Sequence, residues 1–379
     1  MDAELWEQVG LYDPLDPDSA ERLALLDYLT ERGATIEQMV EAHRNGMLPG
    51  VAGDLVTQGK TPMAKVRDIA AESGVSLPRV LRALLAAGIP ADPDTEVPAE
   101  LVRLMEAFEQ GAELMGDEAI LAFTRVLGGT AITIAEAAVA LFFAELGPGT
   151  VREGPDELAR ARISEAATTA FTQVPDVLAR MVMDAFERAQ RRAERARSWL
   201  APFSAEEADA EGPTEVVALG FVDLVGSTAW AQTMNLRDQN LALTRFESAA
   251  WSSAILAGGR VIKTIGDEVF FVAPTADAAC RIGTEVCHAA AFDPLLPAAR
   301  GAVGIGPAIP REGDYFGPLV NLLARLVKVG EPGEFIVTEA VAKELSSDEW
   351  LVRPLEPAEL RGIEGPQRTF HVERRSGSA

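Results

Sequence analysis

The sequence is 379 residues long, and 48% of it is hydrophobic while 24% is charged. A chain of this length and composition can form about two to three soluble domains with apolar cores, which excludes a disordered protein. Its formal net charge is −24. Broad binding to nucleic acid or to an anionic membrane needs a basic surface, so both are excluded as general functions, and any phosphate site has to be local.

The chain is expected to be a cytoplasmic protein with reduced cysteines and no membrane span. The first ten residues carry three acidic side chains and no apolar core of a signal peptide. The most apolar stretch, residues 131–143, is short for a membrane span and contains Glu136, which predicts a buried helix. Cys280 and Cys287 lie in a helical pattern, about 10 Å apart along its axis, so we expect core residues and no disulfide.

The N-terminal part is predicted to be helical and contains a weak internal repeat. Residues 27–46 and 66–90 both have the pattern of a helix, a glycine turn and a capped helix. The second copy resembles the helix-turn-helix units of small DNA-binding regulators. Its candidate recognition helix, 77–86, offers only Arg79 and Arg82 in an acidic domain, so a packing motif is the favoured interpretation and DNA binding is the alternative.

Residues 156–200 have helical periodicity and end in a cluster of arginines, which suits a helix C-terminus. This helix is expected to lead into a linker at 204–212, which is acidic and rich in alanine. The prediction is therefore a helical domain over 1–203 and a domain of alternating strands and helices over 213–379. The helix is either an ordinary solvated helix end or an element that transmits a signal or forms a dimer.

The first chemical motif follows an apolar, β-branched run. A buried strand is expected to end at Asp223 and to turn into a helix through Gly226, Ser227 and Thr228. Backbone N–H groups at a helix start can bind phosphate, so these three residues are candidate phosphate ligands.

A second aspartate is expected at the tip of a hairpin. Gly266-Asp267 lies between the strand-like runs 260–264 and 268–272, which is typical of a tight turn between paired strands. Either aspartate by itself is most simply a turn or cap residue. Together, Asp223 and Asp267 suit Mg²⁺, which takes one or two carboxylates and the phosphate oxygens of a substrate.

A third motif places two polar side chains on one helix face. Asn321 and Arg325 are four positions apart, just after the helix start predicted at Gly317-Pro318. Arginine offers forked donors to a phosphate on which charge develops, and asparagine can orient a sugar oxygen.

With these motifs, residues 213–374 resemble the class III nucleotidyl cyclases, which make cyclic nucleotides from nucleoside triphosphates. The resemblance implies an α+β two-domain protein, in which an all-α regulatory domain precedes a catalytic domain of the ferredoxin-like βαββαβ palm fold. It also implies two Mg²⁺ or Mn²⁺ ions per active site, held by Asp223, Asp267 and the backbone carbonyl of Leu224.

The resemblance assigns base selection to Lys263 and Asp314. A lysine and an aspartate are similar to the adenine-selecting pair of the family, whereas guanylate cyclases tend to carry glutamate and a small polar residue or cysteine. The expected substrate is therefore ATP, and the expected products are cyclic AMP and pyrophosphate.

The family's transition-state pair falls on Asn321 and Arg325, and residues 360–365 resemble the loop before the last strand, where Arg361 would contact phosphate. In this family the site lies between two catalytic domains. One contributes the metal aspartates and the neighbourhood of the base-selecting lysine, and the other contributes the asparagine and arginine. Because the chain has one such domain, the resemblance implies a homodimer with two composite sites.

The order of helical domain, long helix and single cyclase domain is similar to autoinhibited soluble adenylate cyclases of the actinobacterial type, which implies inhibition by the N-terminal domain. The stimulus stays open. His43 is the only histidine before residue 204 and suggests a pH switch, as do paired carboxylates. An apolar ligand such as a lipid tail, bound between the helices of residues 101–146, is a further alternative.

Three other functions are alternatives to a regulated adenylate cyclase. Gly266-Asp267-Glu268 suggests a diguanylate cyclase, but the second preceding glycine of that family is missing and it has no asparagine-arginine helix. A guanylate cyclase would differ in base selection. A DNA-binding regulator with a silent cyclase domain is disfavoured, because every catalytic position is filled.

Overall fold

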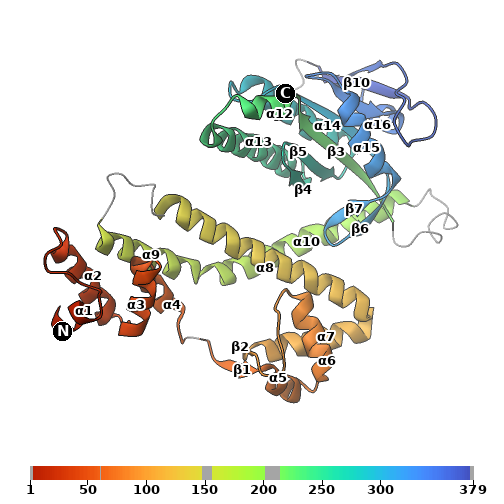
Figure 1. The fold of residues 1–379 in the computed structure, drawn as a ribbon. Helices are drawn as coiled ribbons and strands as arrows, with labels where there is room; N and C mark the ends of the chain where they lie inside the picture. Colours follow the sequence, from red (N-terminus) through yellow and green to blue (C-terminus); the bar gives the residue numbers. More distant parts are fainter. Residues whose placement is uncertain (1–2, 60, 147–155, 201–213, 376–379) are drawn as a thin grey trace. The chain divides into compact units, whose positions relative to one another are not determined.

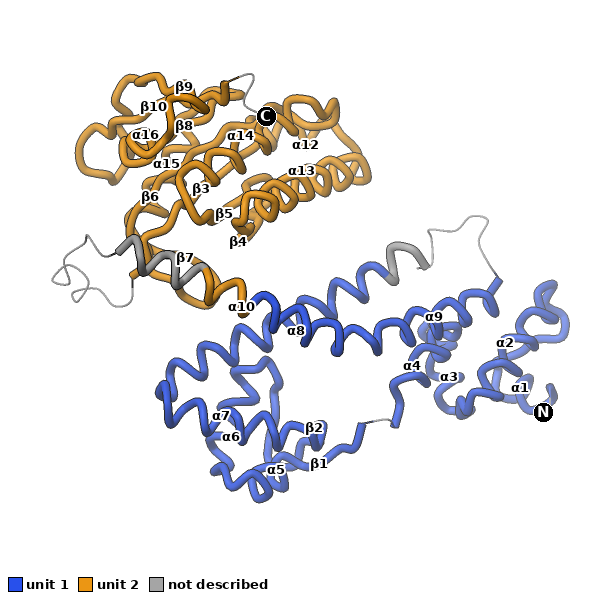
Figure 2. The backbone as a smooth tube through the Cα atoms, turned by 180° about the vertical axis from the view of Figure 1, so that it is seen from behind, with its two compact units in different colours: residues 1–185 blue, residues 186–379 orange. Residues whose placement is uncertain are grey.

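The computed structural model describes residues 3–59, 61–146, 156–200 and 214–375 (Figure 1). The chain divides into two compact units, residues 1–185 and 186–379 (Figure 2). This division falls inside a helix, whereas the linker predicted at 204–212 lies outside the described residues. The domain boundary placed near residue 204 stays a prediction.

The first unit is largely helical. Its elements are α1 (Ala3–Gln8), α2 (Ser19–Glu31), α3 (Ile36–Arg44), the 3₁₀ turn η1 (Leu48–Gly50), α4 (Val51–Thr57), β1 (Met63–Lys65), α5 (Val66–Ser73), α6 (Leu77–Ala86), β2 (Glu96–Pro98), α7 (Leu101–Met115), α8 (Asp117–Leu146) and α9 (Glu157–Phe171), and α10 (Val174–Leu200) begins in it. The region is not entirely helical, because β1 and β2 form an antiparallel ribbon around the α5–α6 pair. Such three-residue strands carry too little pattern to be recognised in a sequence.

The internal repeat is confirmed as two helix pairs, α2–α3 and α5–α6. In the second pair Gly74 has a left-handed φ of 72°, a conformation that costs glycine least, and this ends α5. In the first pair Thr35 and Gln38 form a capping box at the start of α3. Arg79 and Arg82 of α6 form ion pairs with acidic residues of α7 and α8, namely Glu109, Asp117 and Glu118. The packing interpretation is therefore the one that the contacts support.

The apolar stretch 131–143 was expected to be a buried helix; it is helical, but residues 131–141 are not buried. It belongs to α8, whose first turns contribute Ile120 and Leu121 to the core. Farther along α8 the apolar side chains face solvent, and Leu141 is 66% exposed. In the part of the chain that the structure describes, residues 117–141 are the one helix long and apolar enough to cross a membrane, a criterion that core helices of soluble proteins also meet.

The single helix expected over 156–200 is instead two helices. α9 ends at Phe171 and α10 begins at Val174, with Pro175 in the first turn of α10. Proline cannot donate a helical hydrogen bond and clashes with the preceding turn, so it is tolerated at a helix start and not inside one. α9 packs against α2, η1 and α4. At Gly53 of α4 an added Cβ would lie 2.6 Å from Ser164 Oγ, which shows how closely α4 and α9 approach.

The second unit is a mixed α/β domain. Its elements are β3 (Glu215–Leu224), α12 (Ser227–Gln232), α13 (Leu236–Leu256), β4 (Arg260–Ile265), β5 (Glu268–Ala273), α14 (Ala276–Phe292), β6 (Ala299–Arg311), β7 (Asp314–Phe316), α15 (Pro318–Val329), β8 (Phe335–Thr338), α16 (Glu339–Glu344), β9 (Trp350–Pro354) and β10 (Thr369–Arg374). The run β3–α13–β4–β5–α14–β6 confirms the expected βαββαβ order.

One sheet, in the order β4-β5-β3-β6-β8-β10-β9, separates two cores. Alternate residues of β3 point to opposite faces, so Val222 packs with α13 and α14 while Phe221 packs with α15. Cys280 and Cys287 of α14 are buried, free core residues, as expected. Burial raises the pKa of both thiols, that of Cys287 to about 12, so neither is a reactive thiolate.

Candidate active site

The site is built where the central strand β3 ends. Asp223 is the penultimate residue of β3, and its side chain is only 4% exposed. Beyond it Gly226 adopts a left-handed φ of 69° and α12 starts at Ser227, so the expected strand, turn and helix are all present. This helix start contains the three predicted phosphate ligands, Gly226, Ser227 and Thr228. Their binding of phosphate stays a prediction.

The second aspartate lies directly beside the first. Asp267 is in the two-residue turn between β4 and β5, as predicted, and Gly266 takes the positive φ of 64° that such a turn needs. Residue Asp223 is paired across the sheet with Glu268, and the Leu224 N–H donates to the Asp267 carbonyl at 3.2 Å. The sheet register therefore brings the two expected metal ligands together.

Asp223 is also held by two cations that the sequence analysis missed. Arg300 donates to one carboxylate oxygen, Oδ2, from Nε at 3.1 Å and from Nη2 at 2.9 Å. Lys328 Nζ lies 2.7 Å from the other oxygen, Oδ1, and 2.7 Å from Glu268 Oε2. Burial lowers the pKa of Lys328, but its contacts with the two carboxylates outweigh burial and raise it above the ordinary value.

Pairing across the sheet was the one signal that could have revealed Arg300. It stands opposite Asp223 in the β3–β6 register, but this register is not evident from two strands that are far apart in sequence. Lys328 comes from α15, and it reaches Asp223 only because this helix packs against β3 and β6. A lysine near a helix C-terminus is ordinary in sequence, where it complements the helix dipole.

The two residues expected to select the base form an ion pair. Lys263 of β4 contacts Asp314 at the start of β7. Arg260 of the same strand donates to the Gly313 carbonyl at 2.9 Å and so ties the β6–β7 hairpin to β4. The result is a hydrogen-bond donor beside an acceptor, both partly open to solvent.

Asn321 and Arg325 lie on the exposed side of α15, as the spacing predicted, while Leu323 and Leu326 of this helix enter the core. Arg325 Nη1 donates to the Asn321 carbonyl at 3.2 Å. Its Nη2 approaches Gly362, in the loop before β10, where an added Cβ would be 3.7 Å away. This loop also carries Arg361, which is exposed, so both arginines lie in one neighbourhood.

The donor set fits a hard divalent cation. Asp223, Asp267 and the Leu224 carbonyl are oxygen ligands, which Mg²⁺ and Mn²⁺ prefer. Among the residues that the structure describes, no group of three His, Cys, Asp or Glu side chains is arranged to hold a metal. In a Mg²⁺ site with two carboxylates, phosphate oxygens of the substrate would supply further ligands.

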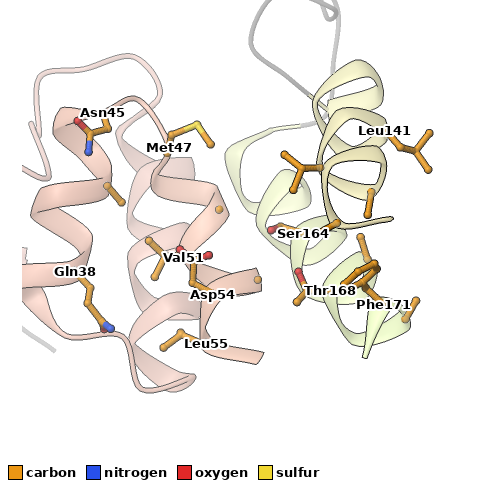
Figure 3. Close-up of a pocket in the computed structure, with 18 of the residues that line it drawn as sticks. Gln38, Asn45, Met47, Val51, Asp54, Leu55, Leu141, Ser164, Thr168 and Phe171 are labelled. Carbon is orange, nitrogen blue, oxygen red and sulfur yellow. The ribbon is translucent and has the colours of Figure 1, made fainter. Parts of the chain in front are cut away.

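A separate cavity of about 960 Å³ lies in the first unit (Figure 3). It is lined by residues of α3, η1, α4, α8, α9 and the start of α10, among them Met47, Val51, Leu141 and Phe171. The lining is mainly apolar, with Gln38, Asn45 and Asp54 as polar groups at the α3–α4 side. It therefore lies between α8 and the α3–α4 region, and not among the helices of residues 101–146 alone.

Comparisons with known proteins find similarity in both the helical part and the α/β part of the chain. Residues 7–193 match the family described as adenylate cyclase regulatory domain. An uncharacterized protein of Mycobacterium tuberculosis is 30% identical over 375 residues, which is 98% of this chain and 94% of that protein. A pH-sensitive adenylate cyclase of M. tuberculosis is 29% identical over 377 residues, or 95% of this chain and 90% of that protein.

Among solved structures, an adenylyl cyclase from Pseudomonas aeruginosa covers 44% of this chain and 98% of its own, with 18% identity and a TM-score of 0.38. The two mycobacterial relatives align with both units of this chain. The regulatory-domain match covers nearly all of the first unit. It belongs to the class III nucleotidyl cyclases that carry an N-terminal adenylate cyclase regulatory domain.

Proposed function

We propose that this chain is an adenylate cyclase that converts ATP to 3′,5′-cyclic AMP and pyrophosphate. The proposal rests on the position of Asp223 and Asp267, where the end of β3 adjoins the β4–β5 turn. A hydrogen bond from the Leu224 N–H to the Asp267 carbonyl links the two segments. Two carboxylates that adjoining segments bring together suit divalent cations that also bind a triphosphate. One relative that aligns with 95% of this chain is an adenylate cyclase.

Each site residue then has a chemical task. Bound Mg²⁺ or Mn²⁺ would make the ribose 3′-hydroxyl more acidic and neutralise the leaving pyrophosphate. Asp223, Asp267 and the Leu224 carbonyl would hold the two ions. Arg325 would stabilise charge that develops on the α-phosphoryl oxygens, and Asn321 would orient the ribose, so neither residue needs to move a proton.

Adenine recognition is assigned to the Lys263–Asp314 pair. A donor beside an acceptor matches the ring N1 acceptor and the amino donor on one edge of adenine. The alternative, a guanylate cyclase, would need an acceptor where Lys263 stands. Gly226, Ser227, Thr228 and Arg361 are assigned to phosphate contacts.

The active form is proposed to be a homodimer with two composite sites. Arg300 and Lys328 of the same chain hold Asp223. Arg325 lies near Gly362, which follows Arg361 in the sequence. A two-fold pairing of chains can set Asn321 and Arg325 of one chain opposite the aspartates of the other.

Regulation is assigned to the first unit. α9, which precedes α10, is tied to α2 by ion pairs of Arg22 with Glu157 and of Arg32 with Glu165. His43 Nδ1 lies 3.2 Å from Arg22 Nη1. His43 thus contacts the same arginine that pairs with Glu157, which places it at the contact between α2 and α9.

The first test measures cyclic AMP and cyclic GMP formation by the full-length chain and by residues 204–379, with ATP or GTP and Mn²⁺. We expect cyclic AMP from both and a higher rate from the shorter chain, because a misplacement of about 1 Å between catalytic groups can cost roughly 100-fold. Equal rates would reject inhibition by the first unit, and cyclic GMP as the main product would reject the assignment of ATP.

The stimulus is tested separately with the variant His43→Gln. The wild-type rate is expected to change between about pH 5.5 and 8, the range in which histidine titrates, and the variant is expected to lose that change. A second series adds fatty acids, because the apolar cavity of the first unit is a site for a lipid tail in this proposal. Turnover that fatty acids leave unchanged would count against that ligand.

Two further assignments concern DNA binding and cellular location. DNA binding is disfavoured by the ion pairs that already occupy Arg79 and Arg82. A cytoplasmic location is part of the proposal, and its support is the pair of buried, free cysteines.

A further inference from the structure

The two cations beside Asp223 differ in how firmly they are held. Arg300 donates twice to Asp223 Oδ2, and its Nη1 also donates to the carbonyls of Lys328 and Gly330 at 2.8 and 3.1 Å. Its side chain is 18% exposed. Among the described residues, Lys328 Nζ forms its ion pairs with the carboxylates of Asp223 and Glu268, and its side chain is 49% exposed. Arg300 is therefore a fixed part of the site, whereas Lys328 can leave.

The carboxylate oxygen that Lys328 contacts is the one that Arg300 leaves free. Oδ2 of Asp223 already accepts both bonds from Arg300, so a divalent cation would compete for Oδ1, where Lys328 Nζ lies at 2.7 Å. An ammonium group and a divalent ion bound to the same oxygen would lie close enough for their positive charges to repel each other strongly. A metal that binds Asp223 Oδ1 therefore favours the departure of Lys328 from that oxygen.

We propose that Lys328 is an internal cation that exchanges with the divalent metal at Asp223. Without metal it neutralises a carboxylate that is almost completely buried, which would otherwise be costly to the fold. When metal binds, the ammonium leaves Oδ1 and keeps Glu268 as its partner. Lys328 thus preserves the geometry of the empty site and weakens its affinity for metal. This inference rests on the proposed metal site at Asp223.

The test measures the dissociation constant of Mn²⁺ alone, without nucleotide, for the full-length protein by electron paramagnetic resonance. Lys328→Met removes the competing charge and keeps most of the side-chain volume. We expect it to bind Mn²⁺ about tenfold more tightly, the effect of one charge-assisted hydrogen bond. The metal-free variant should also unfold at a lower temperature, and saturating Mn²⁺ should raise its Tm by more than it raises that of the wild type.

Mn²⁺ affinity that is unchanged or weaker in Lys328→Met would overturn the exchange. If this variant does not fold, Lys328→Gln, which keeps a hydrogen-bond donor without the charge, is judged by the same criterion. The matched control is Lys343→Met, which removes an exposed lysine from an ion pair with Glu339 on α16 and should leave Mn²⁺ affinity unchanged.

Asp223→Asn separates this inference from the proposed function. If Asp223→Asn loses Mn²⁺ binding while Lys328→Met binds as the wild type does, the metal site stands and the exchange is wrong. If Asp223→Asn binds Mn²⁺ as the wild type does, the metal lies elsewhere and both proposals are wrong.

Discussion

Arg300 donates two hydrogen bonds to a single carboxylate oxygen of Asp223, at 2.9 and 3.1 Å, from the position directly opposite on the neighbouring strand. Asp223 is thereby oriented while it is almost completely buried, and the backbone carbonyls of Lys328 and Gly330 hold Arg300 in place. A proposed metal ligand is thus fixed in position by the protein itself.

Removal of Arg300 should cost stability as well as activity. Arg300→Leu leaves a buried carboxylate with only Lys328 as its partner, and losing one member of a buried pair commonly costs about 3–5 kcal/mol. The measurement is the unfolding transition followed by tryptophan fluorescence, since Trp350 is buried in the second unit. Arg353→Leu, which removes an exposed arginine from an ion pair with Glu373, is the control and should change stability little.

The composite site predicts that two inactive variants rescue each other. Asp223→Asn and Arg325→Ala should each lose about 100-fold or more in kcat. Mixed in equal amounts, half of the dimers would combine the two variants, and each of those would have one intact site, so activity should recover to about a quarter of the wild type. A mixture no more active than its components would show that each chain builds its site alone.

Base choice should depend on the Lys263–Asp314 pair and not on the metal site. Lys263→Glu combined with Asp314→Cys reverses the donor and removes the acceptor, so kcat/KM for ATP should fall relative to that for GTP by roughly 100-fold. Mn²⁺ affinity should stay as it is in the wild type, because neither residue contacts Asp223. An unchanged ratio of cyclic AMP to cyclic GMP would remove this pair from base selection.

The ion pair of Arg32 with Glu165, which joins α2 to α9, should weaken only in strong acid. The hydrogen bond from Tyr28 lowers the pKa of Glu165, burial opposes this, and Arg32 lowers it further, so it falls below the ordinary value of 4.5. A carboxyl group whose pKa is lowered by folding stabilises the fold above its unfolded pKa and loses this contribution as pH falls through the folded pKa. Glu165 therefore stays ionised across the physiological range.

Glu165→Gln should accordingly lower the Tm of the first unit at pH 7 by about 2–4 °C, which corresponds to about 1 kcal/mol in a unit of this size. The difference from wild type should shrink below about pH 4.5, where the wild-type carboxylate begins to lose its charge. Glu72→Gln, an exposed residue of α5, is the matched control. A difference that is the same at pH 4 and pH 7 would show that the charge of Glu165 is not what joins the helices.

The sequence by itself determined the local parts of this protein. The apolar run before Asp223, the Gly-Asp turn at Asp267 and the four-residue spacing of Asn321 and Arg325 all predict their structures from short-range rules of strand, turn and helix. The helix pairs around Gly33 and Gly74 follow from the same rules, because glycine readily adopts the left-handed conformation in which many helices end.

Only the tertiary structure decided which distant residues meet. Arg300 and Lys328 reach Asp223 through strand register and helix packing, which depend on long-range contacts that no local pattern contains. The same reason explains the error at residues 131–143, whereas the error at 156–200 has a local cause. Hydrophobicity predicts that α8 is apolar, but burial depends on what packs against it, and the break before α10 depends on a single proline whose position in the helix was not recognised.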